Sequence, residues 1–443
     1  MKPNNSLLYI SIMAKNDIIT VFCFGQEIGR LGFDENQQKS SFQYNPDFLQ
    51  SDRFHNLFPA TGILKRTPQV QVFSQYNSET FRGLPPMIAD SLPDVFGNII
   101  FKKWMESGNK EFNKISVIEQ LAYVADRGMG ALEYCPSKEL PPSASIDLTE
   151  IIAVLKEVLQ AKDEQHESTL NHEALLNIFK IGSSAGGARP KILISEHKTY
   201  GEIIPGDLNH SSEYNHYLIK LHLDDELGYS REVIEYCYYL TAIRLGISMM
   251  PSKLIEQKHF ATLRFDRQEG KKKHVLTATG LTGWDYQSPK DSSYENLFEL
   301  ALFLKVPYRD IEELFKRMVF NVVFFNSDDH LKNHSFIYDE EQDKWNISPA
   351  YDITYSLNPL MNYTRTSRAL SINGKRVDIT LEDVLTIAET FTIKNPKKVI
   401  QEIQDAIVYW NDQANELNLP ATIIQSVQRD FVRLIEDFDT SAG

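Results

Sequence analysis

Hydrophobic and polar residues follow two different periods along this chain. Up to about residue 265, short strand-like runs such as Ile18–Phe24 and Phe260–Phe265 alternate with turn residues and a few helical segments. From residue 296 onward, apolar positions recur three and four residues apart, which is the spacing of an amphipathic helix. The pattern therefore predicts strands mainly in the first part of the chain and helices in the last part.

The clearest helical pattern follows Asp310, which we expect to cap the helix. One face of this helix carries only apolar side chains, namely Ile311, Leu314, Phe315, Met318, Val319, Val322 and Val323. Burying each of them contributes roughly 1.5–3 kcal/mol before the entropy cost. We expect this helix to be the hub of the C-terminal part and to fix where the loop at 326–333 begins.

Local signals place other helices. Ser230 is a good N-cap for a helix over residues 230–245, and Thr380 begins a near capping box. The last helix is expected over Ala421–Phe438. Residues 358–376 are polar between these apolar patterns, so we predict a mobile loop there.

Length and charge narrow the class of protein. A chain of 443 residues is expected to form more than one domain, and we place the boundaries at 1–145, 146–268 and 269–443. The charge is −14, from 46 Lys and Arg against 60 Asp and Glu, which argues against direct nucleic-acid binding. No apolar run approaches the ~20 residues of a membrane span, and the N-terminus lacks a signal-peptide pattern. We expect a soluble, cytoplasmic protein without membrane contact.

Acidic and amide residues are frequent between residues 326 and 353. Asp328 precedes Asn333 by five positions, and Asp352 follows a short hairpin-like segment. If the fold brings them together, two carboxylates about 4 Å apart repel by roughly 4 kcal/mol at an intermediate dielectric. A hard cation such as Mg²⁺ would relieve this repulsion. The pattern Asp-x-x-x-x-Asn followed by a later Asp is the layout of a kinase catalytic loop, with Asp328 as base.

A glycine-rich stretch, GSSAGGARPK, covers residues 182–191. Its small residues let backbone N–H groups approach anionic oxygens, and Arg189 and Lys191 stand beside it. It is not a Walker loop, because Ala188 stands where that motif needs Lys. The stretch has two possible interpretations, a phosphate-binding loop and a turn that binds no ligand.

Lys220 lies in a mostly apolar strand, and Glu235 lies on the following helix. A strand-borne Lys that neutralises phosphates and pairs with a helix-borne Glu is a kinase arrangement. A solvated Lys and a surface Glu are the competing interpretations. The next strands end in LRFDR, residues 263–267, which would connect two lobes and offer backbone hydrogen bonds to adenine.

Taken together, these motifs resemble the HipA family of bacterial toxin–antitoxin serine/threonine kinases. The resemblance rests on LPPMIADSLPDVFG, GSSAGGARPK, the strand with Lys220, LRFDR, FNSDDHLKNHSF and WNISPAYDI. It implies an α+β fold: a two-lobed, protein-kinase-like fold with an N-terminal β-rich subdomain and an all-helical C-terminal lobe.

The resemblance also assigns roles to residues. Asp328 resembles the catalytic base and His330 a phosphate-facing neighbour, while Asn333 and Asp352 resemble the Mg²⁺ ligands. The ATP-binding positions would be Lys220, Ser184, Ala185, Gly186, Gly187, Leu263, Phe265 and Asp266, the last toward the ribose. The family's glycine-rich loop carries an autophosphorylated serine, which matches Ser184, with Ser183 as the alternative.

Two positions depart from the family pattern. Asp329 stands where many members have glycine, so a third metal ligand and a solvated neighbour are both open. Leu263 replaces a more usual Glu in the connector, which puts a side-chain contact to adenine in doubt.

The function implied by the resemblance is ATP- and Mg²⁺-dependent phosphorylation of a protein. The targets would be translation-related, such as an aminoacyl-tRNA synthetase, and the partner would be a DNA-binding antitoxin. A catalytically silent kinase-fold module that binds an antitoxin is the alternative, and a small-molecule kinase is a third possibility.

Overall fold

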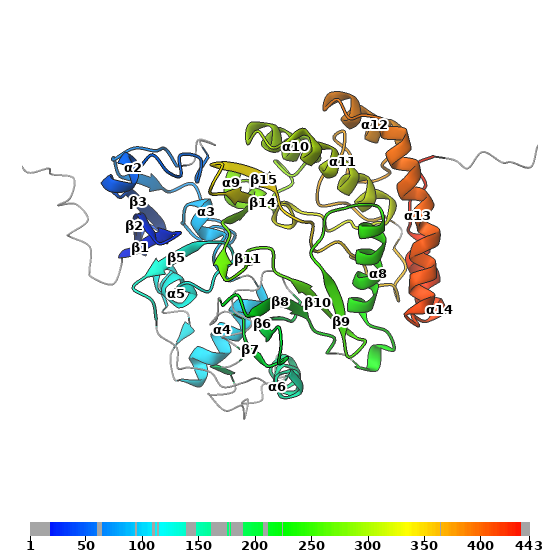
Figure 1. Ribbon diagram of the computed structural model, residues 1–443, viewed down its shortest axis with the longest axis horizontal. Helices are drawn as coiled ribbons and strands as arrows, with labels where there is room; N and C mark the ends of the chain where they lie inside the picture. Colours follow the sequence, from blue (N-terminus) through cyan, green and yellow to red (C-terminus); the bar gives the residue numbers. More distant parts are fainter. Residues whose placement is uncertain are drawn as a thin grey trace, which may run out of the picture. The chain divides into compact units, whose positions relative to one another are not determined.

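The computed structural model describes residues 18–59, 64–93, 95–108, 111–112, 115–138, 148–160, 175–176, 178, 189–206, 211–223, 225–363 and 365–435. The chain divides into two compact units. The first contains residues 1–223, 261–283 and 337–343, and the second contains residues 224–260, 284–336 and 344–443. Sheets and helices both contribute to the described chain, as the sequence pattern predicts (Figure 1).

A five-stranded antiparallel sheet opens the first unit. Its strands lie in the order β4-β3-β2-β1-β5. Their bounds are Gln71–Phe73, Lys39–Tyr44, Gln26–Asp34, Ile18–Cys23 and Leu132–Cys135. In β1 buried side chains alternate with half-buried ones, so one face of the strand packs into the core.

The described residues of the first unit also form helices. They are α2 (Pro46–Gln50), α3 (Pro86–Ala89), α4 (Val95–Ser107), α5 (Val117–Val124), α6 (Leu148–Gln160) and α9 (Ala278–Thr282). Ser116 caps α5 by accepting a hydrogen bond from the Glu119 backbone N–H. The sequence also predicts Asp94 as the cap of α4, and this residue lies outside the described residues.

A second sheet in this unit carries the predicted phosphate lysine. β7 (Ile203–Pro205), β6 (Lys191–His197) and β8 (Tyr214–Lys220) are neighbours in that order. β10 (His259–Leu263) begins in the second unit and ends in the first. The unit also holds β11 (Arg267–Gln268), β12 (Lys271–Lys272) and β13 (Val275–Thr277).

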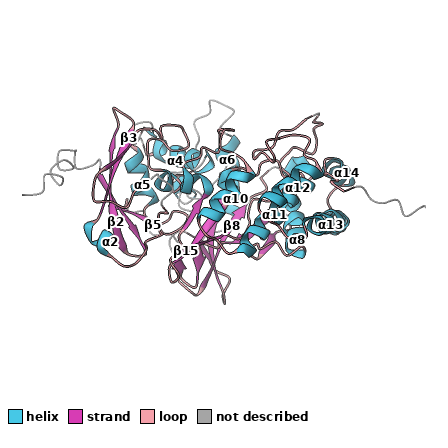
Figure 2. Ribbon diagram, turned by 90° about the horizontal axis from the view of Figure 1, so that it is seen from above, coloured by secondary structure: helices cyan, strands magenta, loops and turns pink. Residues whose placement is uncertain are grey.

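Helices dominate the second unit, where they gather side by side (Figures 1 and 2). They are α8 (Arg231–Arg244), α10 (Tyr294–Phe303), α11 (Tyr308–Val323), α12 (Leu381–Thr390), α13 (Pro396–Glu416) and α14 (Ala421–Arg429). The shorter elements are η2 (Asp225–Leu227), β9 (Ser252–Ile255), η3 (Leu331–Asn333), β14 (Ser335–Asp339, shared with the first unit) and β15 (Lys344–Ile347). α13 packs against both α8 and α11.

The hub predicted at α11 is confirmed. All seven apolar residues of the predicted face are buried, and the helix spans Tyr308–Val323. Asp310 is not its cap, because Pro307 occupies that position. The Asp310 carboxylate lies in the first turn and accepts a hydrogen bond from the Ile347 backbone N–H at 3.0 Å, so it fastens β15 to the helix.

The predicted last helix is too long, because α14 ends at Arg429. Two other expected caps are confirmed: the Ser230 side chain caps α8, and Thr380 and Asp383 form a capping box on α12. No helix among the described residues combines the length and apolar character that crossing a membrane requires.

Candidate functional site

The loop after α11 carries two adjacent carboxylates in opposite environments. The helix gives way to the loop at Phe325, whose φ of +55° lies in the left-handed region. Asp328 is exposed, whereas Asp329 is buried with 1% of its surface accessible. The base predicted at Asp328 can therefore be reached from solvent, and Asp329 is not a solvated neighbour.

Asn333 ties this loop together. Its side-chain Nδ2 donates to the Asp328 backbone carbonyl at 2.8 Å, and its backbone N–H donates to the His330 carbonyl at 2.8 Å. These two bonds use the nitrogen atoms of Asn333. The amide oxygen, the atom that a hard cation prefers, is left for another partner.

Asp352 is held next to this loop by its two preceding residues. The Ala350 N–H donates to the Ser248 carbonyl at 2.7 Å, and the Tyr351 hydroxyl donates to the Lys332 carbonyl at 2.8 Å. Asp352 itself has a φ of +56°. A non-glycine residue is uncommon in this left-handed region, although Asp tolerates it better than most residues.

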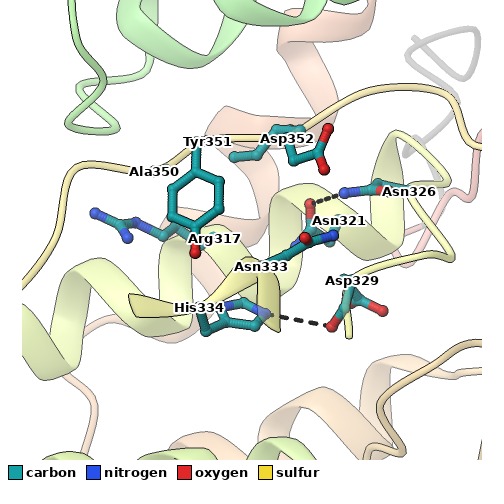
Figure 3. Close-up of a pocket in the computed structure, with 10 residues that line it drawn as sticks. Arg317, Asn321, Asn326, Asp329, Asn333, His334, Ala350, Tyr351 and Asp352 are labelled. Carbon is teal, nitrogen blue, oxygen red and sulfur yellow. Dashed lines mark hydrogen bonds between the residues drawn. The ribbon is translucent and has the colours of Figure 1, made fainter. Parts of the chain in front are cut away.

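These residues border one small polar pocket within the second unit (Figure 3). Its lining consists of Arg317, Asn321, Asn326, Asp329, Asn333, His334, Ala350, Tyr351, Asp352 and Ile353. The structure thus brings Asn333 and Asp352 together, while the Asp328 side chain lies outside the lining. The roles of all three residues in catalysis stay predictions.

The donor atoms of the pocket fit a hard divalent cation. Carboxylate and amide oxygens are the ligands that Mg²⁺ accepts. In the part of the chain that the structure describes, no three His, Cys, Asp or Glu side chains are grouped to hold a metal ion. Any cation here would therefore be held by a mixed set of carboxylates and amides.

Asp329 belongs to a buried hydrogen-bond network around this pocket. Its Oδ2 accepts from the Tyr294 hydroxyl and from Arg368 Nη2, each at 2.6 Å. Arg368 also donates to the backbone carbonyls of Asn321 and Asn326, at 3.2 and 2.9 Å. The loop at 326–333 is therefore pinned to the end of α11 and to the chain segment that follows Asp352.

The network corrects the second part, from Arg368 onward, of the mobile loop predicted over residues 358–376. Arg368 is 6% exposed, and Leu370 and Ile372 are fully buried. The polar composition misled the prediction because both Nη atoms of the Arg368 guanidinium find acceptors inside the protein. The sequence did contain one signal, the polar Asn321 within the otherwise apolar run of residues 318–325.

Burial keeps two nearby groups neutral. It raises the pKa of Tyr294 well above the usual value, an effect that the Asp329 carboxylate reinforces, so this phenol remains a hydrogen-bond donor. Burial lowers the pKa of His334 to about 4. The ring of His334 hydrogen-bonds the Asp329 carbonyl at 3.3 Å.

His330 is half-buried beside an aromatic side chain. The ring of Tyr286 lies 4.9 Å from the His330 ring, and Lys332 Nζ lies 5.3 Å from the centre of the same Tyr286 ring. His330 is also the N-cap of η3. The predicted phosphate-facing role of His330 stays a prediction.

In the first unit, Lys220 faces a second lysine. Lys191 of β6 and Lys220 of β8 are direct partners in the antiparallel register, so their side chains share one face. They are only 5% and 6% exposed. Two buried positive charges on one face favour an anion nearby. The predicted partner Glu235 is buried on α8 in the other unit, so that ion pair stays a prediction.

The connector after β10 holds Asp266 in a buried network of hydrogen bonds. This carboxylate is fully buried and accepts bonds from Arg264 Nε and Nη2, Arg267 Nη1 and the Gly130 N–H, all between 2.8 and 3.0 Å. Burial alone would raise its pKa, but the two arginines lower it well below the usual range. Asp266 fastens the connector to Gly130, and its predicted contact with a ribose stays a prediction.

Two further expectations concern the nucleotide. Leu263 is half-buried and Phe265 is 8% exposed, and their contact with adenine stays a prediction. The glycine-rich positions Ser183, Ser184, Ala185, Gly186 and Gly187 lie outside the described residues.

Family models match most of the chain. The HipA N-terminal domain matches residues 19–135, and the HipA-like C-terminal domain matches residues 183–411, which is more than half of the chain. A curated relative, the putative kinase Y4dM of Sinorhizobium fredii, is 21% identical over 174 residues. That match covers 38% of this chain and 41% of the relative, so it spans about two fifths of the relative's length.

Two solved structures are similar. HipA of Shewanella oneidensis MR-1, in a complex with HipB and operator DNA, has a TM-score of 0.60 at 14% identity and covers 93% of this chain and 95% of that one. The Helicobacter pylori proinflammatory kinase CtkA has a TM-score of 0.36 at 11% identity and covers 49% of this chain and 85% of its own. The fold is a kinase-like α+β fold. Together with the two domain matches, this shows that the chain belongs to the HipA family.

Proposed function

We propose that this chain is a toxin kinase of the HipA type that transfers the γ-phosphoryl group of ATP to a serine or threonine of a protein. The observation that carries the proposal is the pocket beside the loop of Asp328. Oxygen donors from Asn333 and Asp352 border this pocket, and the Asn333 side chain is bonded to the backbone of Asp328 itself. The relative named as a putative kinase supports the same class of activity.

The chemistry would be positioning and charge neutralisation. The substrate hydroxyl oxygen forms a bond to the γ-phosphorus while the bond to the ADP oxygen breaks, and the hydroxyl proton passes to Asp328. Asn333 and Asp352 would hold Mg²⁺, which when bound neutralises charge on the phosphate oxygens. Lys220 and His330 would stabilise phosphate charge, and Leu263 and Phe265 would meet the adenine.

The biological setting follows from the family. We propose a translation-related protein, such as an aminoacyl-tRNA synthetase, as the target. A DNA-binding antitoxin is the proposed partner, by analogy with the similar HipA that is complexed with HipB and operator DNA. Autophosphorylation of Ser184, or of Ser183, in the glycine-rich stretch would switch the kinase off.

Phosphate transfer can be tested on the chain itself. The purified protein is incubated with Mg·ATP, and its intact mass is measured over time. We expect a gain of one phosphate that Asp328→Asn and Asp352→Asn each slow by at least about 100-fold, the scale on which a general base acts. Asp412→Asn, an exposed position on α13, removes the same charge and should leave the rate unchanged.

The alternative of a catalytically silent module gives the opposite result. Such a module would bind ATP without gaining mass, and the variants would not differ from the unaltered chain. A mass gain that both variants retain would contradict the assigned roles. Transfer to free small molecules, with no gain on any protein, would favour a small-molecule kinase.

A further inference from the structure

The two carboxylate oxygens of Asp329 have different surroundings. Oδ2 accepts both charge-assisted bonds, from Arg368 and from Tyr294. Oδ1 is buried and has no hydrogen-bond partner among the described residues. Leaving a buried acceptor unsatisfied costs about 1–3 kcal/mol, and more for a charged group. Such an oxygen in a native protein indicates a water molecule or an ion.

The position of Asp329 favours an ion. The residue lines the same pocket as Asn333 and Asp352, so the oxygen donors there come from three separate positions of the chain (Figure 3). Asn321 and Asn326, which also border the pocket, bond each other at 3.1 Å through the Asn326 amide nitrogen and the Asn321 oxygen. Asp329 is therefore the remaining carboxylate with an oxygen to offer.

The partners of Oδ2 resemble the outer shell of a metal ligand. Carboxylates that ligate metals are themselves hydrogen-bonded, which fixes their orientation. Arg368 is a rigid anchor for this purpose, because it also bonds the carbonyls of Asn321 and Asn326. Tyr294 is fully buried and donates to the same oxygen, so rotation of the Asp329 carboxylate would break two bonds.

We propose that Asp329 is a third oxygen ligand of the cation site, through Oδ1, beside Asn333 and Asp352. Arg368 and Tyr294 act as positioning residues that keep Oδ1 turned into the pocket. The inference rests on the proposed function only in taking the cation to be the one that accompanies ATP. Because two carboxylates would share the ion, the site should bind a divalent cation even before the nucleotide arrives.

Cation binding without nucleotide tests this directly. Mn²⁺, a stand-in for Mg²⁺, is titrated into the full chain and its affinity is measured by calorimetry. We expect Asp329→Asn to weaken Mn²⁺ binding about 10- to 100-fold, and Asp412→Asn to leave it unchanged. Thermal unfolding of each variant, without metal, reports separately on the buried contacts that Asp329 makes.

The proposal would be overturned by an Asp329→Asn protein that melts earlier but binds Mn²⁺ as well as the unaltered chain does. Asp329 would then be a partner of Arg368 and Tyr294 and not a ligand. If that variant does not fold, anomalous scattering from a Mn²⁺-soaked crystal of the unaltered chain decides instead. A manganese ion at Asn333 and Asp352 with Asp329 Oδ1 bonded to water, or the absence of manganese from the pocket, would contradict the proposal.

The Mn²⁺ titration tests the role of Asp329 independently of the phosphate-transfer assay that tests the kinase activity. If the chain transfers phosphate and Mn²⁺ affinity does not depend on Asp329, only the ligand assignment is wrong. If Mn²⁺ affinity depends on Asp329 but no phosphate is transferred from Mg·ATP, the cation site stands and the kinase assignment is wrong.

Discussion

Buried titratable side chains set the pH range in which this fold is stable. His274 lies in the first unit with none of its surface exposed, beside the rings of Phe58 and Tyr338. Burial lowers its pKa to about 3, against a usual value of about 6.5. At a pH between these two pKa values, the imidazole of His274 binds a proton in the unfolded chain but not in the folded chain. The free energy of unfolding should therefore fall as the pH falls below about 6.5.

The variant His274→Gln isolates this effect. Each such histidine contributes a slope that approaches about 1.4 kcal/mol per pH unit. We expect the variant to lose close to one such slope when urea unfolding is measured at pH 7.5, 6.5, 5.5 and 5.0. His55→Gln, at an exposed position, should keep the slope of the unaltered chain. An unchanged slope in His274→Gln would mean that this ring is protonated within the folded protein.

At the scale of elements, α11 supports the loop at 326–333 through its buried face. Met318 is fully buried on this face, so Met318→Ala should lower the free energy of unfolding by about 2–5 kcal/mol, measured by urea denaturation. Val408→Ala truncates an apolar side chain that is 67% exposed on α13, and it should cost less than about 0.5 kcal/mol. Equal effects of the two changes would contradict the role of α11 as the hub.

Elements fixed by neighbouring residues were predictable from the sequence. The Ser230 cap and the Thr380 capping box depend on contacts within a few positions, and both form as expected. The apolar face of α11 was predictable for the same reason, since its apolar residues recur every three or four positions in the sequence.

Contacts between distant residues were not predictable in this way. Arg368 reaches Asp329 across 39 positions, and nothing local distinguishes it from the exposed Arg365 nearby. Asp266 combines both cases, because its carboxylate bonds the neighbouring Arg264 and Arg267 and also accepts from the Gly130 N–H across 136 positions. Both residues lie in polar stretches that patterns assign to the surface, and only the fold shows that their charges are paired inside.

At the scale of the whole molecule, the predicted functions are spread over both compact units. The first unit carries Lys220 and the connector residues, and the second carries Asp328, Asn333 and Asp352. By its internal contacts the chain separates into two compact units. The division into three domains that we expected stays a prediction. The proposed kinase activity would need both sets of residues, so we expect nucleotide and cation to bind as coupled ligands.

Thermodynamic coupling between Mg²⁺ and ATP tests this account most directly. The dissociation constant of ATP is measured by calorimetry with Mg²⁺ and with a chelator, for the unaltered chain, Asp352→Asn and Asp412→Asn. We predict that Mg²⁺ tightens ATP binding about tenfold or more in the unaltered chain and in Asp412→Asn, and that this gain is largely lost in Asp352→Asn. The same gain in all three proteins would contradict the claim that this pocket holds the cation.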